Sequence, residues 1–384
     1  MRSMLARSSG LGVLVAAVGL VGACSITLED LFPPLNVAPY VQARLIAPAV
    51  TPRSLAVLPD GRVFFTEKNT GQVRVISNGV LLSTAFVDLP VNAAGDRGLL
   101  GIAVHPQFNI NHRVYVFYTR SVTGEDSASA ANGLEHRIVY FNASGDVASG
   151  GEVFVASIPV AVDGRRVGGN ITFATDATLL VAVGDQGEDA AAADNASLFG
   201  KVLRYNDDGT IPADNPIAGS PVYARGLRHP QGITTDPVTG NVFLLDRNAG
   251  RVHEINLLRA GRDFGWPAVA GIATSAAELA YAAANPAYAD PVLDSGSGSS
   301  PFVGVAFNPS AKYGQSTAGD LFYGLAADKV VNSAEVGGTR DRVDSVAEFA
   351  HGFPEQIVDL AFSPAGTLYV ATFGGVYRLD TFSR

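Results

Sequence analysis

A six-fold recurrence of paired apolar runs constrains this chain more than any other feature of its sequence. In each unit, two runs rich in β-branched and aromatic residues flank a turn of Pro, Asp or Gly type, which predicts a β-hairpin. The units begin at Ser54, Gly98, Asn170, Gly232, Gly304 and Val358. A regular series of hairpins is typical of an all-β repeat architecture.

Further strands follow several of these hairpins, among them QVRVIS from Gln72 and RVHEIN from Arg251. About four strands per unit make up a β-propeller blade, so the sequence predicts an all-β fold, a six-bladed β-propeller. A propeller places its binding site at one end of the central channel, in the loops that join the strands.

Residues 41–384 are best interpreted as one domain. The chain has 384 residues, of which 47% are apolar and 16% charged, so it can bury a large core and no disordered domain is expected. Length alone would favour more than one domain, but a propeller grows by adding blades around one axis.

Residues 1–23 have the features of a targeting segment. Arg2 and Arg7 supply a positive start, and the apolar stretch from Leu11 to Ala23 is too short and glycine-rich to span a membrane. It ends at Cys24, the only cysteine, in a sequence that resembles the lipobox of bacterial lipoproteins. The resemblance implies cleavage before Cys24 and lipidation of its sulfur. An ordinary secretory peptide with an incidental cysteine is the alternative.

Residues 24–40 are Pro-rich and aperiodic, and we interpret them as a tether. The protein is then expected in the bacterial cell envelope, periplasmic or at the cell surface, with Cys24 as its only link to a membrane. Ser25 gives no retention signal of the aspartate type, which favours the outer membrane where one exists. The net charge of −9 disfavours nucleic acid and anionic membrane surfaces as partners.

Two adjacent stretches carry a specific resemblance: LFGKVLRYNDDGTIPADNPI from Leu198 and YARGLRHPQGITTDPVTGNVFLLDRNAGRVHEINLLRAGRDFGWPAVAG from Tyr223. With GLLGIAVHPQF at Gly98, GGNITF at Gly168 and GDQG at Gly184, they are similar to the soluble quinoprotein sugar dehydrogenases, the glucose/sorbosone dehydrogenase family. The resemblance implies a six-bladed propeller that holds pyrroloquinoline quinone (PQQ) and calcium at its mouth and oxidises a sugar.

The family's catalytic base is a histidine in a His-x-x-Gly segment, and the corresponding residue here is Arg166. Sugar oxidation of this kind needs a base for the hydroxyl proton and positive charge near the quinone oxygen. Arginine stays protonated, so Arg166 can stabilise an anion but cannot accept a proton. The substitution predicts low or absent turnover.

The loop from Gly226 to Gly232 resembles the family's Gly-His-Arg-Asn-Pro-Gln-Gly loop and keeps its arginine as Arg228. The resemblance places Arg228 against a bound anionic or carbonyl group, in the cofactor site. Capping of loop carbonyls or pairing with a carboxylate is the alternative. His229 stands where the family has asparagine, and it is either a relocated base and cofactor contact or a plain surface-loop histidine.

Calcium in the family is held by the backbone carbonyls of a Gly-Pro pair and by an acid that opens an Asp-Glu-x-Asn run. The corresponding positions are Asn248-Ala249 and His253. Backbone oxygens can still bind a hard cation, but an imidazole nitrogen is a poor calcium ligand. Asp246 and Glu254 are candidate substitutes if strand alternation turns either of them inward.

The closing blade lacks two groups that hold the cofactor's carboxylates in the family. The family's Arg-x-Arg-Asp pattern is replaced by QIVD at residues 356–359, so both guanidinium groups are missing. Lys329 lies near the position of a cofactor-binding lysine, and Asp96 replaces a polar amide. The resemblance still implies PQQ and calcium as cofactors, with weakened binding.

Two functions remain open. The first is a lipid-anchored, PQQ-dependent dehydrogenase of an aldose or related alcohol. The second is a non-catalytic propeller that binds a carbohydrate, an anion or a protein, with Arg165 and Arg166 near Arg228 forming an anion-binding mouth. Alternatively, Arg165 and Arg166 belong to a solvated loop. A hydrolase of the calcium-propeller type ranks last, because the sequence has no dedicated acid cluster, and the oligomeric state is left open.

Overall fold

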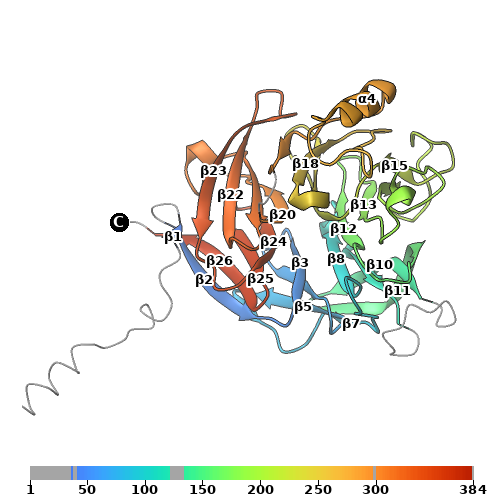
Figure 1. The fold of residues 1–384 in the computed structure, drawn as a ribbon. Coiled ribbons are helices and arrows are strands. Elements are labelled where there is room, and N and C mark those ends of the chain that lie inside the picture. The colour runs from blue at the N-terminus through green and yellow to red at the C-terminus, as the bar shows by residue number, and fades with distance from the viewer. Residues whose placement is uncertain (1–35, 38–40, 122–133, 297–299, 383–384) are drawn as a thin grey trace, which may run out of the picture.

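The computed structural model describes residues 36–37, 41–121, 134–296 and 300–382, and it confirms the all-β fold with six blades (Figure 1). The first runs of the six repeats form the inner strands, which contact one another in a ring. These strands are β3 (Pro52–Val57), β8 (Leu99–Val104), β12 (Gly168–Phe173), β16 (Pro230–Thr235), β20 (Phe302–Phe307) and β24 (Ile357–Phe362).

Each inner strand pairs antiparallel with the second run of its repeat, as the hairpin pattern predicts. The second strands are β4 (Val63–Glu67), β9 (Arg113–Thr119), β13 (Leu179–Val183), β17 (Val242–Arg247), β21 (Leu321–Leu325) and β25 (Leu368–Thr372). The third strands are β5 (Gln72–Ser77), β10 (Glu135–Ser144), β14 (Lys201–Tyr205), β18 (His253–Leu258), β22 (Val330–Val336) and β26 (Gly375–Thr381).

Five outer strands follow directly in the sequence and complete blades 1 to 5. They are β6 (Val80–Leu81), β11 (Val147–Pro159), β15 (Val222–Arg225), β19 (Leu293–Asp294) and β23 (Val343–His351), with β7 (Val87–Asp88) also on β5 and β1 (Asn36–Val37) on β23. The helical segments are α3 (Phe108–Asn111), α4 (Ala276–Ala284), η2 (Asp189–Ala192), η3 (Ala249–Arg251) and η4 (Gln315–Thr317).

Blade 6 is completed by the beginning of the chain. Strand β2 (Val41–Pro48) pairs antiparallel with β26, so the N-terminal and C-terminal strands lie side by side, blue beside red in Figure 1. This pairing closes the ring and leaves no open edge between the first and last blades. The sequence analysis did not predict it.

The apolar core lies between neighbouring blades. The buried residues form six clusters, one for each contact between adjacent blades, and the cluster between blades 2 and 3 includes Tyr115, Phe117, Val181 and Leu203. Sheets that are apolar on both faces explain the continuous apolar runs of the sequence. The apolar core therefore holds neighbouring blades together.

Every inner strand begins with an irregularity in its pairing with the second strand. The shift skips Arg53 and Ser54 in blade 1, Gln231 in blade 4 and Val358 in blade 6. A bulge turns the extra residue out of the regular alternation of the strand. All six bulges lie at the same end of the channel, because all six inner strands run in the same direction.

The structure does not describe the segment in which a signal peptide and a lipidated cysteine are expected. Residues 1–23 and Cys24 lie outside the described residues. Strand β1 falls within the segment interpreted as a tether and pairs with β23 of blade 5. Within the described ranges, no helix has the length and apolar character that a membrane span requires.

Candidate functional site

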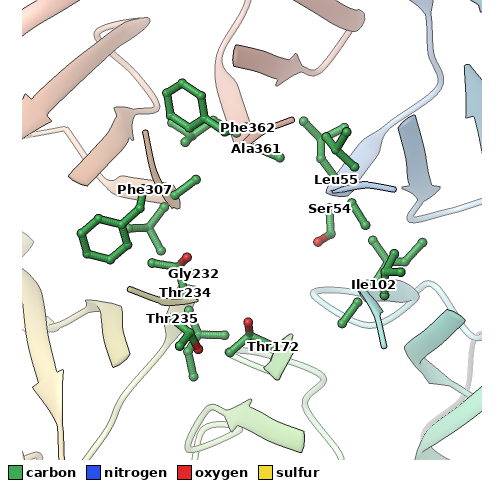
Figure 2. A pocket seen from close by; sticks show the side chains of 18 of the residues that line it. Ser54, Leu55, Ile102, Thr172, Gly232, Thr234, Thr235, Phe307, Ala361 and Phe362 are labelled. Carbon is green, nitrogen blue, oxygen red and sulfur yellow. The ribbon is translucent and has the colours of Figure 1, made fainter. Parts of the chain in front are cut away.

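The two ends of the central channel differ in chemistry. The end at which the inner strands finish holds a cavity of about 470 Å³, and the hydroxyl groups of Ser54, Thr172 and Thr234 lie among apolar side chains there (Figure 2). Asp359 is the one titratable residue that lines it among the described residues. General acid–base catalysis needs a positioned proton donor and acceptor, and this end of the channel supplies one carboxyl group among the described residues.

The opposite end, where the inner strands begin, holds a cavity of about 650 Å³ that we call the mouth. Among the residues that line it are Arg53, Lys68, Asp96, His229, Gln231 and Arg247. A neighbouring hollow of about 450 Å³ shares Arg247 with the mouth and adds Arg228, Asn248 and Ala249. Convergent charged groups in a cavity of this size make the mouth the candidate site.

Arg166 is held away from the mouth by carboxylates. Its backbone N–H donates to Oδ2 of Asp96 at 2.6 Å, in a left-handed conformation with φ 52°. Its Nε lies 2.8 Å from Oδ1 of Asp185, and its Nη2 lies 2.7 Å from Oδ1 of Asp189. The cation at the position of the family's base is therefore neutralised, and its side chain does not line the mouth.

Asp185 links two blades beneath the mouth. It is fully buried, and its Oδ2 accepts a hydrogen bond of 2.8 Å from Nε1 of Trp266. Burial raises the pKa of Asp185 to about 6, against the opposing effects of the Gly187 N–H and Arg166. The preceding Gly184 has no room for a side chain, because a Cβ there would meet the carbonyl oxygen of Arg166 at 1.7 Å.

The neighbouring Arg165 is solvated. Its side chain is 66% exposed and pairs with Asp163 at 2.7 Å. The consecutive arginines that the sequence suggested as an anion-binding mouth are thus both matched by carboxylates. For Arg165, the alternative of a solvated loop describes what is found.

Arg228 differs from Arg166 because no described carboxylate pairs with it. Its guanidinium lies 5.2 Å from the centre of the Trp266 ring, and its Nη1 makes only long contacts of 3.4 and 3.5 Å with the carbonyls of Arg247 and Asn248. Its Nε is buried without a hydrogen-bond partner. Burial, and then Arg166, lower the pKa of Arg228. This arginine remains available to an anionic group.

His229 is mostly buried at the mouth, with a side chain that is 13% exposed. Burial lowers the pKa of His229 to about 3, although Asp96 opposes the shift, and Arg53 lowers it further. Its Nε2 lies 3.9 Å from Oδ2 of Asp96. The imidazole is therefore neutral at physiological pH, and the surface-loop interpretation does not describe its environment.

Asp246 and Glu254 face each other across β17 and β18, and both are buried. Burial, reinforced by Glu254, raises the pKa of Asp246 to about 7. Its oxygens accept from the backbone N–H groups of Arg228 and His229 at 2.8 and 2.7 Å. Asp246 therefore fixes the loop that carries both candidate residues.

Glu254 is engaged in a second network. Its Oε1 accepts from Nδ2 of Asn248 at 2.8 Å and from the N–H of Gly271 at 2.5 Å, and its Oε2 accepts from Nδ2 of Asn256 at 3.0 Å. Each oxygen of Glu254 and of Asp246 thus already accepts a hydrogen bond.

The residues assigned to calcium do not fit it. Oδ1 of Asn248 caps the N–H of Ala249 at 3.0 Å, and the Asn248 carbonyl faces the Arg228 cation. Over the residues that the structure describes, no three His, Cys, Asp or Glu side chains are placed to hold a metal. Calcium favours six to eight oxygen ligands, several of them charged, and this set does not supply them.

The two remaining candidates lie apart. Asp96 lines the mouth, and its carboxylate is 47% exposed. Nζ of Lys329 donates to the Pro354 carbonyl at 2.7 Å, and Lys329 lines neither the mouth nor the neighbouring hollow. The structure brings Asp96 and His229 together at the mouth, with Arg228 beside them, and does not bring Lys329 to them.

The sequence analysis missed Arg53, Lys68 and Arg247. Nη2 of Arg53 donates to Oε1 of Gln231 at 3.2 Å, and Nζ of Lys68 donates to the Ala93 carbonyl at 3.0 Å. A signal for Arg53 was present in the sequence, because it directly precedes the first hairpin and inner strands begin at the mouth. These cations and Arg228 fit a carboxylated ligand such as PQQ, since none of the three arginines has a carboxylate within 4 Å in the described structure.

Comparison with known proteins gives a consistent result. The family model "Glucose / Sorbosone dehydrogenase" matches residues 49–378. The chain is 29% identical to aldose sugar dehydrogenase YliI of Escherichia coli over 84% of this chain and 86% of the relative. It is 28% identical to quinoprotein glucose dehydrogenase B of Acinetobacter calcoaceticus over 67% of this chain and 61% of the relative.

Two further matches agree. An uncharacterized protein of Synechocystis is 32% identical over 57% of this chain and 57% of its own length. The crystal structure of soluble aldose sugar dehydrogenase from E. coli in its apo form has a TM-score of 0.76 and 26% identity, covering 89% of this chain and 100% of that one. The chain therefore belongs to the glucose/sorbosone dehydrogenase family.

Proposed function

We propose that this protein is a sugar dehydrogenase of the quinoprotein type that oxidises an aldose or related alcohol slowly at the mouth of its propeller. The observation that carries the proposal is Arg228, which matches the family's arginine and has no carboxylate partner, beside a cavity of about 650 Å³. The names of the relatives, an aldose sugar dehydrogenase and a quinoprotein glucose dehydrogenase, support this substrate class.

PQQ, when bound, would accept a hydride from the sugar carbon that bears the reacting hydroxyl. Arg228 would stabilise the negative charge that develops on the acceptor, since a cation without a partner needs no rearrangement before it can act. Arg53 and Arg247 would hold carboxylate groups of the ligand. The Trp266 ring, over which the Arg228 guanidinium lies, would help to keep that guanidinium in position.

The hydroxyl proton is the weak point of the reaction. Arg166 cannot accept it, and its side chain is paired with Asp185 and Asp189. In the described lining of the mouth, the side chains that can accept a proton are Asp96 and His229. A histidine whose pKa is lowered to about 3 is a weak base, so we expect slow turnover.

The test is dye reduction by the full-length exported protein, supplied with PQQ and calcium, against a panel of aldoses. The proposal expects a rise in Tm on addition of PQQ and slow dye reduction with at least one aldose. The Arg228→Met variant should lose the turnover. Dye reduction that Arg228→Met leaves unchanged, or no reduction with any aldose, contradicts the proposal.

The second candidate is a binding propeller without turnover. The absence of a good base at Arg166 favours it, together with Arg53 and Arg247, which line the mouth and have no carboxylate within 4 Å in the described structure. A rise in Tm with a sugar or sugar acid alone, with no dye reduction under any condition, would support this candidate over the dehydrogenase.

We also propose that the mature protein begins at a lipidated Cys24 and is held in the bacterial cell envelope. The lipobox-like sequence before Cys24 supports this proposal. Radioactive palmitate should label the wild type and not the Cys24→Ser variant, and the variant should leave the membrane fraction. Label that persists in Cys24→Ser contradicts the lipoprotein assignment.

A further inference from the structure

Most arginines of the described structure are matched by carboxylates. Those with an Asp or Glu oxygen within 4 Å are Arg62, Arg74, Arg113, Arg120, Arg137, Arg165, Arg166, Arg204, Arg225, Arg340, Arg342 and Arg378. Against this background, the mouth and the neighbouring hollow together hold three arginines with no such partner in the described structure: Arg53 and Arg247 in the mouth, and Arg228 in the hollow. Unmatched cations that meet at one cavity indicate a missing anion.

Arg53 gives the clearest signal. It lies in the bulge at the start of β3 and is mostly withdrawn from water, and burial lowers its pKa, opposed by the more distant Asp359 and Asp96. Its one side-chain hydrogen bond goes to Gln231, a neutral amide. A guanidinium has five N–H donors, so most of its donors remain available to a ligand in the cavity.

Asp359 attracts Arg53 electrostatically but forms no ion pair with it within 4 Å in the described structure. Its Oδ2 accepts from the N–H of Leu55 at 2.8 Å and its Oδ1 from the N–H of Leu360 at 2.9 Å. The Asp359 carboxylate is thus occupied in joining blades 6 and 1.

Arg247 approaches the mouth from the end of β17 and is exposed. It lines both the mouth and the neighbouring hollow that contains Arg228. Lys68, on the turn after β4, adds a further cation to the lining of the mouth. Positive charge therefore borders the mouth on the side of blade 1 and on the side of blade 4.

The wall from blades 5 and 6 is mostly apolar by contrast, with Gln356 as a polar residue in it. Val303, Ala326, Ile357, Val358 and Phe373 line it. Val358 occupies the bulge of blade 6, the position at which Arg53 stands in the adjoining blade 1. The family pattern has an arginine where this chain has Val358, in the bulge of blade 6. In this chain an arginine, Arg53, stands instead in the bulge of blade 1.

We propose that Arg53 and Arg247 form a carboxylate clamp at the mouth, which holds a ligand that combines a carboxylate with a flat or apolar body. The carboxylate belongs either to the quinone cofactor or to an acidic sugar. This inference deepens the proposed function by naming how the ligand is held, and it predicts binding whether or not turnover follows. The cationic side takes the carboxylate, and the apolar wall takes the body of the ligand.

Calorimetric titration of the full-length protein tests the clamp with three probes: PQQ, D-glucuronate and D-glucose. At least one carboxylated probe should bind more tightly than glucose, and its affinity should fall with added salt. Arg53→Met and Arg247→Met should each weaken that binding by about tenfold or more, because each removes charge-assisted hydrogen bonds. Arg53→Lys should recover part of the loss, since it keeps the charge.

The matched control is Arg44→Met, which removes an exposed arginine of β2 that lies outside the mouth. It should leave every affinity unchanged, and Tm measurements show whether each variant is folded. Binding of PQQ identifies the cofactor as the source of the carboxylate, and binding of glucuronate alone identifies the substrate. No binding of either probe, or equal affinity in the wild type and both Met variants, overturns the clamp.

Turnover separates this inference from the proposed function. Loss of affinity in Arg53→Met without dye reduction by the wild type supports the clamp and counts against the dehydrogenase. Dye reduction by the wild type, with the affinities for PQQ and for glucuronate both unchanged in Arg53→Met, counts against the clamp and supports the dehydrogenase.

Discussion

The arginines at this end of the channel fall into two groups, one paired with carboxylates and one not. On the side of blade 3, Arg166 is paired with Asp185 and Asp189, so its charge is neutralised within the protein. On the sides of blades 1 and 4, Arg53 and Arg228 lie partly buried without a carboxylate. The comparison teaches that the available charge of a site depends on partners and cannot be counted from residue types.

The largest expected effect comes from removing Asp185, the buried partner of Arg166. Asp185→Ala leaves Arg166 and Nε1 of Trp266 without their partner in a buried place, so we expect a loss of about 3–5 kcal/mol in the free energy of unfolding. Urea denaturation measures it. The control is Asp163→Ala, which removes the partner of the exposed Arg165 and should leave the midpoint unchanged. Equal losses in the two variants would contradict the distinction between the pairs.

A crossed pair of variants sharpens the comparison. Arg228→Met should weaken PQQ binding by about tenfold or more and leave Tm unchanged or higher, because it removes a cation that has no partner. Arg166→Met should lower Tm and change the affinity by less than about threefold, since its charge is already matched. Calorimetry and thermal melts measure both. The same pattern in both variants would show that the two arginines do not differ as described.

A smaller effect, on the pH dependence of stability, follows from Asp246, which accepts a hydrogen bond from the backbone N–H of Arg228. Its pKa is raised to about 7 by burial and by Glu254, so between about pH 4 and 7 the folded state binds more protons than the unfolded state. The free energy of unfolding should therefore fall as pH rises through this range, by at most about 1.4 kcal/mol per pH unit from this group. Melts from pH 5 to 7 measure it.

Asp246→Asn should flatten this dependence while lowering stability throughout, because an amide cannot accept from both backbone N–H groups. The exposed Asp208→Asn serves as its control and should keep the wild-type slope. An unchanged slope in Asp246→Asn would assign the dependence to other groups.

The smallest expected effect is that of Arg166→His. Asp185 and Asp189 would hold the new imidazole in its charged form, and the neighbouring calcium ligands would still be missing. Dye reduction should therefore stay within about tenfold of the wild type. Robust turnover by this single variant would show that only the base is missing from the site.

The sequence predicted the blades well because their signals are local. Each hairpin needs only alternating or continuous apolar residues around a turn, and all six repeats form inner strands. The pairing of β2 with β26 was not predicted, because no short-range pattern specifies which distant strand completes the last blade. The resemblance showed that an arginine stands at the position of the family's base. It did not show that Arg166 pairs with Asp185 and Asp189, because these two residues lie in the next loop of the blade.

Arg53 shows a second limit of sequence reasoning. Its neighbours at the mouth, Gln231 and Asp96, come from blade 4 and from the start of blade 2, so their meeting depends on closure of the whole ring. A single unmatched arginine in a sequence looks like any surface cation. Only the positions of the carboxylates show that it has no partner.

The strand exchange between β2 and β26 also sets an order of events in synthesis. Blade 6 takes its outer strand from residues 41–48 and its third strand from residues 375–381, so the ring cannot close before residues 375–381 have been made. Closure of the ring is therefore a late step, which requires that both strands of this pair have been made.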